Sequence, residues 1–312
     1  MKPTWINILR DPVDGKKIKL VDSTLKKGRV VKGKLIGSSG RVYEIKSGIP
    51  ILLPPDAQSL DSVESFAYEW DEWGYLFAKK NWLKNNIMPL LKTEKIFSGK
   101  VIVDAGAGSG APSLWMAEAG AKLVVSLELS NAIFTRHKET IKGYEDVIFP
   151  IQCDITHPPI SLKPDILYCV NVLQHTKNPK KTFENLLSLV GKKTTFLFNV
   201  YNKESFLGSK TVEVIRQAVR WMPFKLWKSL SFLMALGIFV LDKKAPWFIK
   251  SKFGNVHFSD NFKELWLQIY DAFGAHYYQF PLSKKEQLDL FRKAKLKIKA
   301  KNYFGYLLVR NL

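Results

Sequence analysis

Hydrophobic residues from position 100 onward occur in short continuous runs that alternate with stretches of helical periodicity. Helical patterns cover residues 111–119 and 131–142, each after one of the first two runs. Continuous apolar strands that alternate with helices are typical of a parallel sheet covered on both faces. The pattern therefore predicts an α/β fold. The five strand-like runs are 101–103, 123–127, 147–153, 165–172 and 194–200.

The C-terminal end has a different pattern. Two β-type runs, 296–303 and 306–309, follow a helical stretch over 284–294. Only Phe304 and Gly305 separate the two runs. A two-residue connection between strands is typical of an antiparallel hairpin. We therefore expect the sheet to close with an antiparallel last strand.

The N-terminal end predicts a small β-rich domain over residues 1–55. Its short β-type runs alternate with Gly, Ser and Asp turns, and a Pro-Pro pair then breaks the pattern. Residues 56–99 are expected to form a linker, clearest over 56–61, and an aromatic helical segment, and residues 100–312 the main domain. The N-terminal runs are 17–21, 29–35, 42–45 and 49–53.

Three aromatic residues of the segment after the linker share one helical face. Phe66, Trp70 and Trp73 are spaced by four and three residues. Such a face packs on a neighbouring domain or covers a ligand, and the sequence leaves both interpretations open. Trp70 is accordingly a candidate substrate contact.

The alternation stops after the fifth strand-like run. Residues 201–261 are rich in Trp, Phe and Leu and contain 10 Lys/Arg against 4 Asp/Glu. This composition predicts a helical cap inserted at about 202–262. Its helices either pack on the main domain with their basic residues solvated, or contact a membrane surface, because large aromatics beside basic residues suit an interfacial helix.

Composition narrows the class of protein. The 312 residues include 48 Lys+Arg and 28 Asp+Glu, a net charge of +20, which suits an anionic partner such as nucleic acid, a lipid headgroup or a phosphorylated substrate. Two cysteines exclude a disulfide framework and any paired-cysteine zinc site. The first 11 residues contain no apolar signal-peptide region, and the longest uncharged apolar stretch, 229–241, is shorter than the about 20 residues of a spanning helix. We therefore predict a cytoplasmic protein.

The strongest chemical signal is the glycine-rich segment 104–110, Asp-Ala-Gly-Ala-Gly-Ser-Gly, between the first strand and a helix. Its glycines, Gly106, Gly108 and Gly110, allow a tight turn and close approach of the backbone to a ligand at a helix N-terminus. Glu128 ends the next predicted strand. A carboxylate there is placed to accept hydrogen bonds from two ribose hydroxyls.

These motifs resemble class I S-adenosylmethionine-dependent methyltransferases over about residues 60–312. Segment 104–110, Glu128, Cys153-Asp154 and segment 165–176 occur in the family's order and spacing. The resemblance implies a Rossmann-like seven-stranded sheet with an antiparallel last strand, and S-adenosyl-L-methionine as cofactor. A dinucleotide oxidoreductase would share the glycines and Glu128 but not the later motifs.

The resemblance also implies roles for individual residues. The glycine loop and Asn171 would hold the methionine part of the cofactor, Glu128 the ribose, and Asp154 with Ile155 the adenine. The implied cofactor residues are Asp104, Gly106, Gly108, Gly110, Glu128, Asp154, Ile155 and Asn171. If the accepting atom is a hydroxyl, a base is useful, and His175 and His276 are the candidates. The candidate substrate residues are Trp70, Gln174, Tyr277 and Tyr278.

The N-terminal unit resembles the small zinc-ribbon-like domain fused ahead of many bacterial methyltransferases. Asp11 and Asp14 stand where those relatives have Cys-x-x-Cys, and the second cysteine pair is absent as well. The usual structural site needs four ligands of this type, so we predict no zinc. No other spacing of His, Asp or Glu indicates a metal, and His137 is expected to be solvated on a surface helix.

The leading hypothesis is methyl transfer from S-adenosylmethionine to a small or amphipathic, lipid-like acceptor, with peripheral contact to the inner membrane surface through the basic aromatic helices. Two alternatives remain open. RNA is an alternative substrate, because the net charge is strongly positive. A non-catalytic, cofactor-binding scaffold at a membrane surface is the alternative from another class.

Overall fold

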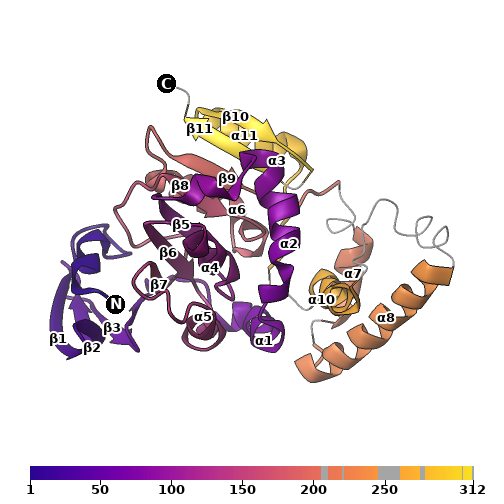
Figure 1. Ribbon diagram of the computed structural model, residues 1–312, viewed down its shortest axis with the longest axis horizontal. Helices are drawn as coiled ribbons and strands as arrows, with labels where there is room; N and C mark the ends of the chain where they lie inside the picture. Colours follow the sequence, from indigo (N-terminus) through magenta and orange to yellow (C-terminus); the bar gives the residue numbers. More distant parts are fainter. Residues whose placement is uncertain (205–209, 220, 245–260, 275–277, 304, 311–312) are drawn as a thin grey trace.

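Eleven strands form one sheet in the computed structural model, in the order β1-β2-β3-β4-β7-β6-β5-β8-β9-β11-β10 (Figure 1). The structure describes the chain except residues 205–209, 220, 245–260, 275–277, 304 and 311–312. The central strands are β5 (Val101–Ala105), β6 (Leu123–Glu128), β7 (Ile148–Cys153), β8 (Ile166–Cys169), β9 (Thr195–Phe198), β10 (Leu296–Lys301) and β11 (Tyr306–Arg310).

The central strands confirm the predicted α/β architecture. Strands β5 to β9 pair in parallel, and their residues are almost all buried, as the continuous apolar runs predict. Strand β11 runs antiparallel to β9 and pairs with β10 through the predicted hairpin. The sheet therefore has the Rossmann-like form with an antiparallel last strand.

The four N-terminal strands extend this sheet at one edge. They are β1 (Lys19–Lys26), β2 (Arg29–Ile36), β3 (Val42–Lys46) and β4 (Ile49–Leu52). The first three connections are antiparallel, whereas β4 pairs in parallel with β7, with Ile51 opposite Gln152. The pairing covers an edge of the central sheet that would otherwise expose backbone donors and acceptors.

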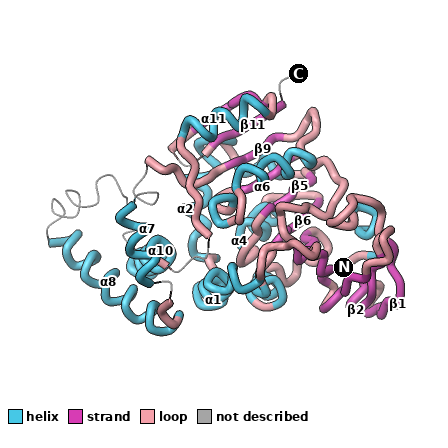
Figure 2. Tube along the Cα trace, turned by 180° about the vertical axis from the view of Figure 1, so that it is seen from behind, coloured by secondary structure: helices cyan, strands magenta, loops and turns pink. Residues whose placement is uncertain are grey.

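Helices cover both faces of the sheet, as Figure 2 shows from behind. One apolar core includes Trp82, Leu91 and Trp115, and the core of the opposite face includes Phe183 and Phe291. The first face has α2 (Lys79–Trp82), α3 (Met88–Leu91) and α4 (Ala111–Glu118), with α5 (Arg136–Thr140) beside them; the second has α6 (Pro179–Leu186) and α11 (Lys284–Lys293).

Short helical turns connect these elements. The 3-10 helices are Pro3–Ile8, Leu60–Val63, Leu76–Ala78, Glu94–Phe97, Asn131–Phe134, Leu173–His175 and Leu187–Leu189, and one π-helical segment covers Leu83–Ile87.

The inserted helices form a third layer at the side of the molecule, next to α1 (Glu64–Trp73) (Figure 1). They are α7 (Lys210–Val219), α8 (Phe224–Lys244) and α10 (Phe262–Phe273). Their apolar residues pack together with Trp73 of α1, whose ring lies 5.2 Å from that of Trp266 and 4.8 Å from that of Tyr270. The aromatic segment is therefore the contact between the insertion and the main domain.

Candidate functional site

One cavity of about 380 Å³ lies at the carboxyl ends of the parallel strands and receives most of the sequence-predicted site residues. Open α/β sheets bind ligands at this edge. The predicted residues on its wall are Trp70, Asp104, Gly106, Gly108, Glu128, Asp154, Ile155, Asn171 and His175.

The glycine loop has the backbone that its sequence predicts. Gly106 and Gly108 have φ values of +82° and +54°, in the left-handed region that favours glycine. A Cβ on Gly106 would lie 2.4 Å from the methyl groups of Val172. A Cβ on Gly108 would lie 2.9 Å from the Trp70 ring. Trp70 of α1 therefore lies directly on the loop, while Trp73 of the same helix packs against the insertion.

Two buried carboxylates follow the next two strands. The N–H groups of Gly108 and Ser130 donate to Glu128 at 2.8 and 2.7 Å. Burial raises the pKa of Glu128 above its usual value. The N–H groups of Gln58 and Thr156 donate to Asp154, both at 2.8 Å. An ionised carboxylate has about four acceptor positions, so both residues keep positions for ligand hydroxyl or amine groups.

A third buried carboxylate lies near the end of β5. Asp104 accepts a hydrogen bond of 2.6 Å from the Ser113 hydroxyl. Burial raises its pKa to about 7, and the Glu128 charge acts in the same direction, whereas the Ser113 hydrogen bond opposes the rise. A cationic group in the cavity would favour the ionised form of Asp104.

His175 is held between aromatic rings at one side of the cavity. Its Nδ1 lies 3.0 Å from the carbonyl oxygen of Tyr278. The ring centroids of Phe66 and Tyr201 lie 4.7 and 5.6 Å from its own, both in edge geometry. Neighbouring Asn171 has a φ of +59° and turns the chain at the cavity wall.

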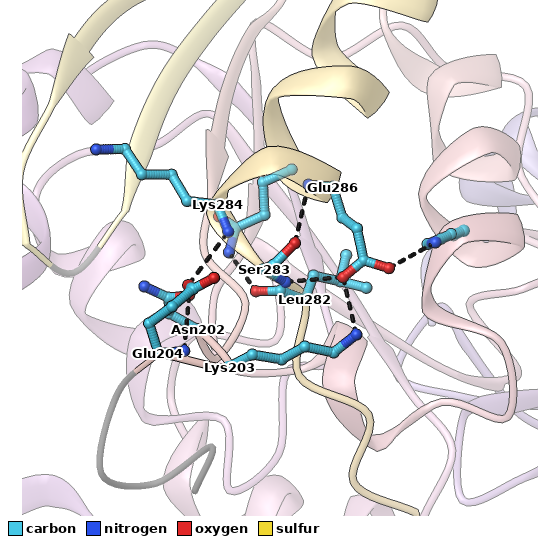
Figure 3. Close-up of polar contacts among 9 residues, drawn as sticks. Asn202, Lys203, Glu204, Leu282, Ser283, Lys284 and Glu286 are labelled. Atoms are coloured by element: carbon cyan, nitrogen blue, oxygen red, sulfur yellow. Dashed lines mark hydrogen bonds and ion pairs between the residues drawn. The ribbon is translucent and has the colours of Figure 1, made fainter.

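A polar network connects residues 202–204 with residues 282–286, two segments far apart in sequence (Figure 3). The Leu282 N–H donates to the Tyr201 carbonyl at 2.9 Å. Ser283 forms a capping box with Glu286 at the start of α11. Lys180 and Lys203 lie 2.7 and 2.9 Å from the Glu286 carboxylate, and with the Ser283 N–H they hold its pKa well below the usual value. The network therefore ties the residues after β9 to the start of α11.

Not every predicted residue reaches the cavity wall. Gln174 is completely buried and is not among the residues that line the cavity. Gly110 caps the start of α4 away from the wall, with a φ of +80°. His276 and Tyr277 lie outside the described residues. Tyr278 meets His175 through its backbone rather than through its ring.

The expectation for His137 is wrong, because its side chain is fully buried against the glycine loop. Its Nδ1 lies 3.1 Å from the Gly108 carbonyl oxygen, and a Cβ on Gly110 would lie 3.0 Å from its ring. Burial lowers the pKa of His137 to about 4, so the ring is neutral at pH 7. It supports the loop as a packed core residue.

Several residues on the wall have no sequence signal of their own. Gln58, in the segment expected to be a linker, donates its N–H to Asp154 and its side-chain amide to the His175 carbonyl. Glu69, Tyr201 and Asp271 come from α1, from the chain after β9 and from α10, and they line the same cavity. None of them belongs to a motif, and local sequence does not distinguish such polar residues from solvent-exposed ones.

The known proteins that this chain is similar to are methyltransferases. A family model described as a methyltransferase domain matches residues 77–237. Protein arginine N-methyltransferase 1 of Dictyostelium discoideum is 26% identical over 112 residues, 30% of this chain and 33% of that protein. A histone-arginine methyltransferase of Arabidopsis thaliana is 32% identical over 102 residues, 27% of this chain and 19% of that protein. The match thus spans a third or less of the length of these curated relatives.

Among solved structures, magnesium protoporphyrin IX methyltransferase from Synechocystis PCC 6803 has a TM-score of 0.41 at 14% identity. That similarity covers 82% of this chain and 90% of that one. A Trypanosoma brucei protein arginine methyltransferase complex has a TM-score of 0.30 at 20% identity and covers 46% of this chain and 44% of that one.

Proposed function

Because the chain belongs to the methyltransferase domain family, with S-adenosylmethionine as its cofactor, we propose that it transfers the cofactor's methyl group to a small amphipathic, lipid-like acceptor. The observation that supports this most directly is the cavity itself. It joins the glycine loop, Glu128 and Asp154 to an aromatic wall formed by Phe66 and Trp70. Polar groups beside aromatic rings suit a charged cofactor next to an acceptor with an apolar part.

The residues of the cavity fit this cofactor. Glu128 would accept from the ribose hydroxyls and Asp154 from the adenine amine, since each carboxylate is buried and keeps acceptor positions. The bound cofactor supplies an electrophilic methyl group. The protein's part is to align the accepting atom with that group and to exclude water, which Trp70 and Gln58 favour by lying over the loop and over Asp154.

The proposal is tested by incubating the purified protein with cell extract and isotopically labelled S-adenosylmethionine, followed by mass spectrometry of the lipid, small-molecule, RNA and protein fractions. We expect the label in an amphipathic small molecule. Label confined to RNA would favour the RNA alternative. Cofactor binding without any labelled product, over extracts of several growth conditions, would support a non-catalytic scaffold.

We propose further that α8 contacts an anionic membrane surface, the inner face of the cytoplasmic membrane. By length and composition alone α8 could cross a membrane, and only 22% of its most apolar window is buried. Leu226, Leu230, Leu233 and Val240 are exposed and lie three, four or seven residues apart, so they form one stripe along the helix. The opposite face, with Trp227, Ser231 and Ala235, is buried against the protein.

The positive charge of the protein indicates which kind of surface this apolar stripe contacts. Lys243 and Lys244 end α8, and the chain has a net charge of +20. An apolar stripe next to basic residues fits a lipid bilayer with anionic headgroups. Helix α8 packs on α10, whose Asp271 lines the cavity, so this membrane contact would lie on the acceptor side of the molecule.

Replacing Leu233 with aspartate should weaken binding to phosphatidylglycerol vesicles about tenfold, because the transfer of one leucine side chain from water contributes about 1.5–3 kcal/mol. Vesicle co-sedimentation measures this. Leu25 on β1 is a matched control, since the exposed fractions of Leu233 and Leu25 are 61% and 58%. Leu25→Asp should bind vesicles like the wild type. Equal binding by Leu233→Asp and the wild type would contradict the contact.

We also propose that the N-terminal unit is a zinc-ribbon-like domain that folds without metal. Asp11 is buried and accepts hydrogen bonds from the Tyr43 hydroxyl at 2.7 Å and the Val13 N–H at 2.9 Å. Asp14 hydrogen-bonds Ser38. These contacts would replace metal bonds by hydrogen bonds at the two positions where the relatives have cysteines.

Elemental analysis of the purified protein should therefore find no zinc at stoichiometric level, and a chelator should leave its melting temperature unchanged. No cluster of three or more metal-ligating side chains occurs within the described part of the chain. One zinc per chain that survives dialysis would refute the proposal.

A further inference from the structure

An acidic pair in the cavity is not needed by the cofactor. Glu69 of α1 and Asp271 of α10 line the same cavity as the glycine loop and His175. The other carboxylates of the wall, Asp104, Glu128 and Asp154, already have places in the expected cofactor site. Glu69 and Asp271 have no place in that cofactor site.

Glu69 has an unusual environment. It is only 1% exposed, and one carboxylate oxygen accepts a hydrogen bond from the Tyr75 hydroxyl. The other oxygen, Oε2, has no hydrogen-bond partner among the residues that the structure describes. Burial, reinforced by the charge of Asp271, raises the pKa of Glu69 well above its usual value. A buried carboxylate oxygen without a hydrogen-bond partner destabilises the folded protein unless a ligand donates a hydrogen bond to it.

Asp271 connects this carboxylate to the methyl-transfer side of the cavity. It hydrogen-bonds Tyr201, whose ring contacts the His175 ring at a centroid distance of 5.6 Å. Glu69, Asp271, Tyr201 and His175 therefore follow one another along one wall. Aromatic rings of Phe66 and Tyr75 complete this part of the wall.

The charge of the wall contrasts with the rest of the protein. The chain has a net charge of +20. Among the described residues, however, those that line the cavity include five Asp and Glu side chains and no Lys or Arg. Arg216 of α7 lies near Tyr201, but it is not part of the wall and its Nε donates to the Ala272 carbonyl. An anionic acceptor would be repelled here, whereas a cationic group would find partners.

We propose that Glu69, with Asp271, binds the accepting atom of the substrate, and that this atom is a basic nitrogen, an amine on an amphipathic molecule. This rests on the proposed methyl transfer and specifies its acceptor. The ammonium group donates hydrogen bonds to Glu69 and gives it one proton. The freed nitrogen lone pair forms the N–C bond while the C–S bond breaks and its electron pair stays on sulfur. The product is an N-methylammonium ion, and the proton on Glu69 passes to solvent.

The test uses three probes with the same chain length and different charge: n-octylamine, n-octanol and octanoate. Each is titrated calorimetrically into the full-length protein saturated with S-adenosylhomocysteine. We expect octylamine to bind at least about tenfold more tightly than octanol, since a hydrogen bond to a charged group contributes about 1.5–3 kcal/mol. Octanoate should bind most weakly. Equal affinities, or tightest binding of octanoate, would overturn the proposal.

Substitutions of Glu69 and Asp271 test whether these two residues cause the preference for octylamine. Glu69→Gln should lose about tenfold in octylamine affinity, by the same charge-assisted hydrogen bond, and leave octanol and S-adenosylhomocysteine affinities unchanged. Asp271→Asn should have a smaller effect of the same kind. Glu64→Gln, at an exposed position of the same helix, is the matched control and should match the wild type. Equal losses of octylamine and octanol in Glu69→Gln would show a purely structural role and overturn the proposal.

These outcomes separate the inference from the proposed function. A protein that does not bind S-adenosylhomocysteine would refute the proposed methyl transfer. A protein that binds it but does not prefer octylamine would refute the amine subsite alone. If Glu69→Gln does not fold, the affinities of the wild-type protein for the three probes still test the amine subsite.

Discussion

Replacing Glu128 with alanine should lower the affinity for S-adenosylmethionine about 100-fold or more. The carboxylate ends β6 in the cavity and would accept charge-assisted hydrogen bonds from two ribose hydroxyls, each contributing about 1.5–3 kcal/mol. The substitution also removes the acceptor of the Gly108 N–H, which helps to hold the glycine loop. Calorimetric titration of the cofactor measures the loss.

Two further variants make the Glu128 result specific. Glu128→Gln keeps the shape and one acceptor oxygen but loses the charge, so its affinity should lie between those of the wild type and the alanine variant. Glu184 of α6 is exposed and distant from the cavity wall, and Glu184→Ala should bind like the wild type. Wild-type affinity in Glu128→Ala would refute the ribose assignment.

Replacing Gly106 with alanine should abolish measurable cofactor binding and destabilise the protein. The residue has a φ of +82°, and the new Cβ would lie 2.4 Å from both methyl groups of Val172. The strained backbone alone costs about 1–3 kcal/mol, and relief of the clash must move either the loop or the segment after β8. Both line the cofactor site. Chemical denaturation and cofactor titration measure the two effects.

Gly143 is the matched control for Gly106. Its φ is +89°, but nothing lies within 4 Å of its Cβ position, so Gly143→Ala imposes backbone strain without a clash. This variant should lose stability by about 1 kcal/mol and keep its cofactor affinity. If both variants bind the cofactor like the wild type, the close packing of Gly106 on Val172 has no role in the site.

The strands and the cofactor loop were predictable because their signals are local. The apolar runs at β5 to β9 have the continuous pattern of buried parallel strands, and residues 104–110 combine the turn with its strand and helix. Glu128 and Asp154 each directly follow or end a strand. The carboxyl ends of parallel strands meet at one edge of a sheet, so their order along the chain already places them together.

Contacts between distant segments were not predictable in the same way. The pairing of β4 with β7 depends on backbone hydrogen bonds, which any apolar strand could make. His137 was expected in solvent and is buried, because its position on a short helix does not specify which side meets the glycine loop. Gln58 reaches Asp154 across 96 residues.

The sequence by itself determined the fold class, the glycine loop and the carboxylates that follow its strands, since short-range periodicity and backbone geometry define these features. Only the tertiary structure decided which residues face the acceptor. Glu69 belongs to the cavity because α10 and Tyr201 pack beside α1 and exclude water from its carboxylate. The same packing decided which side of α8 is buried, because that helix is apolar on both sides and its sequence favours neither.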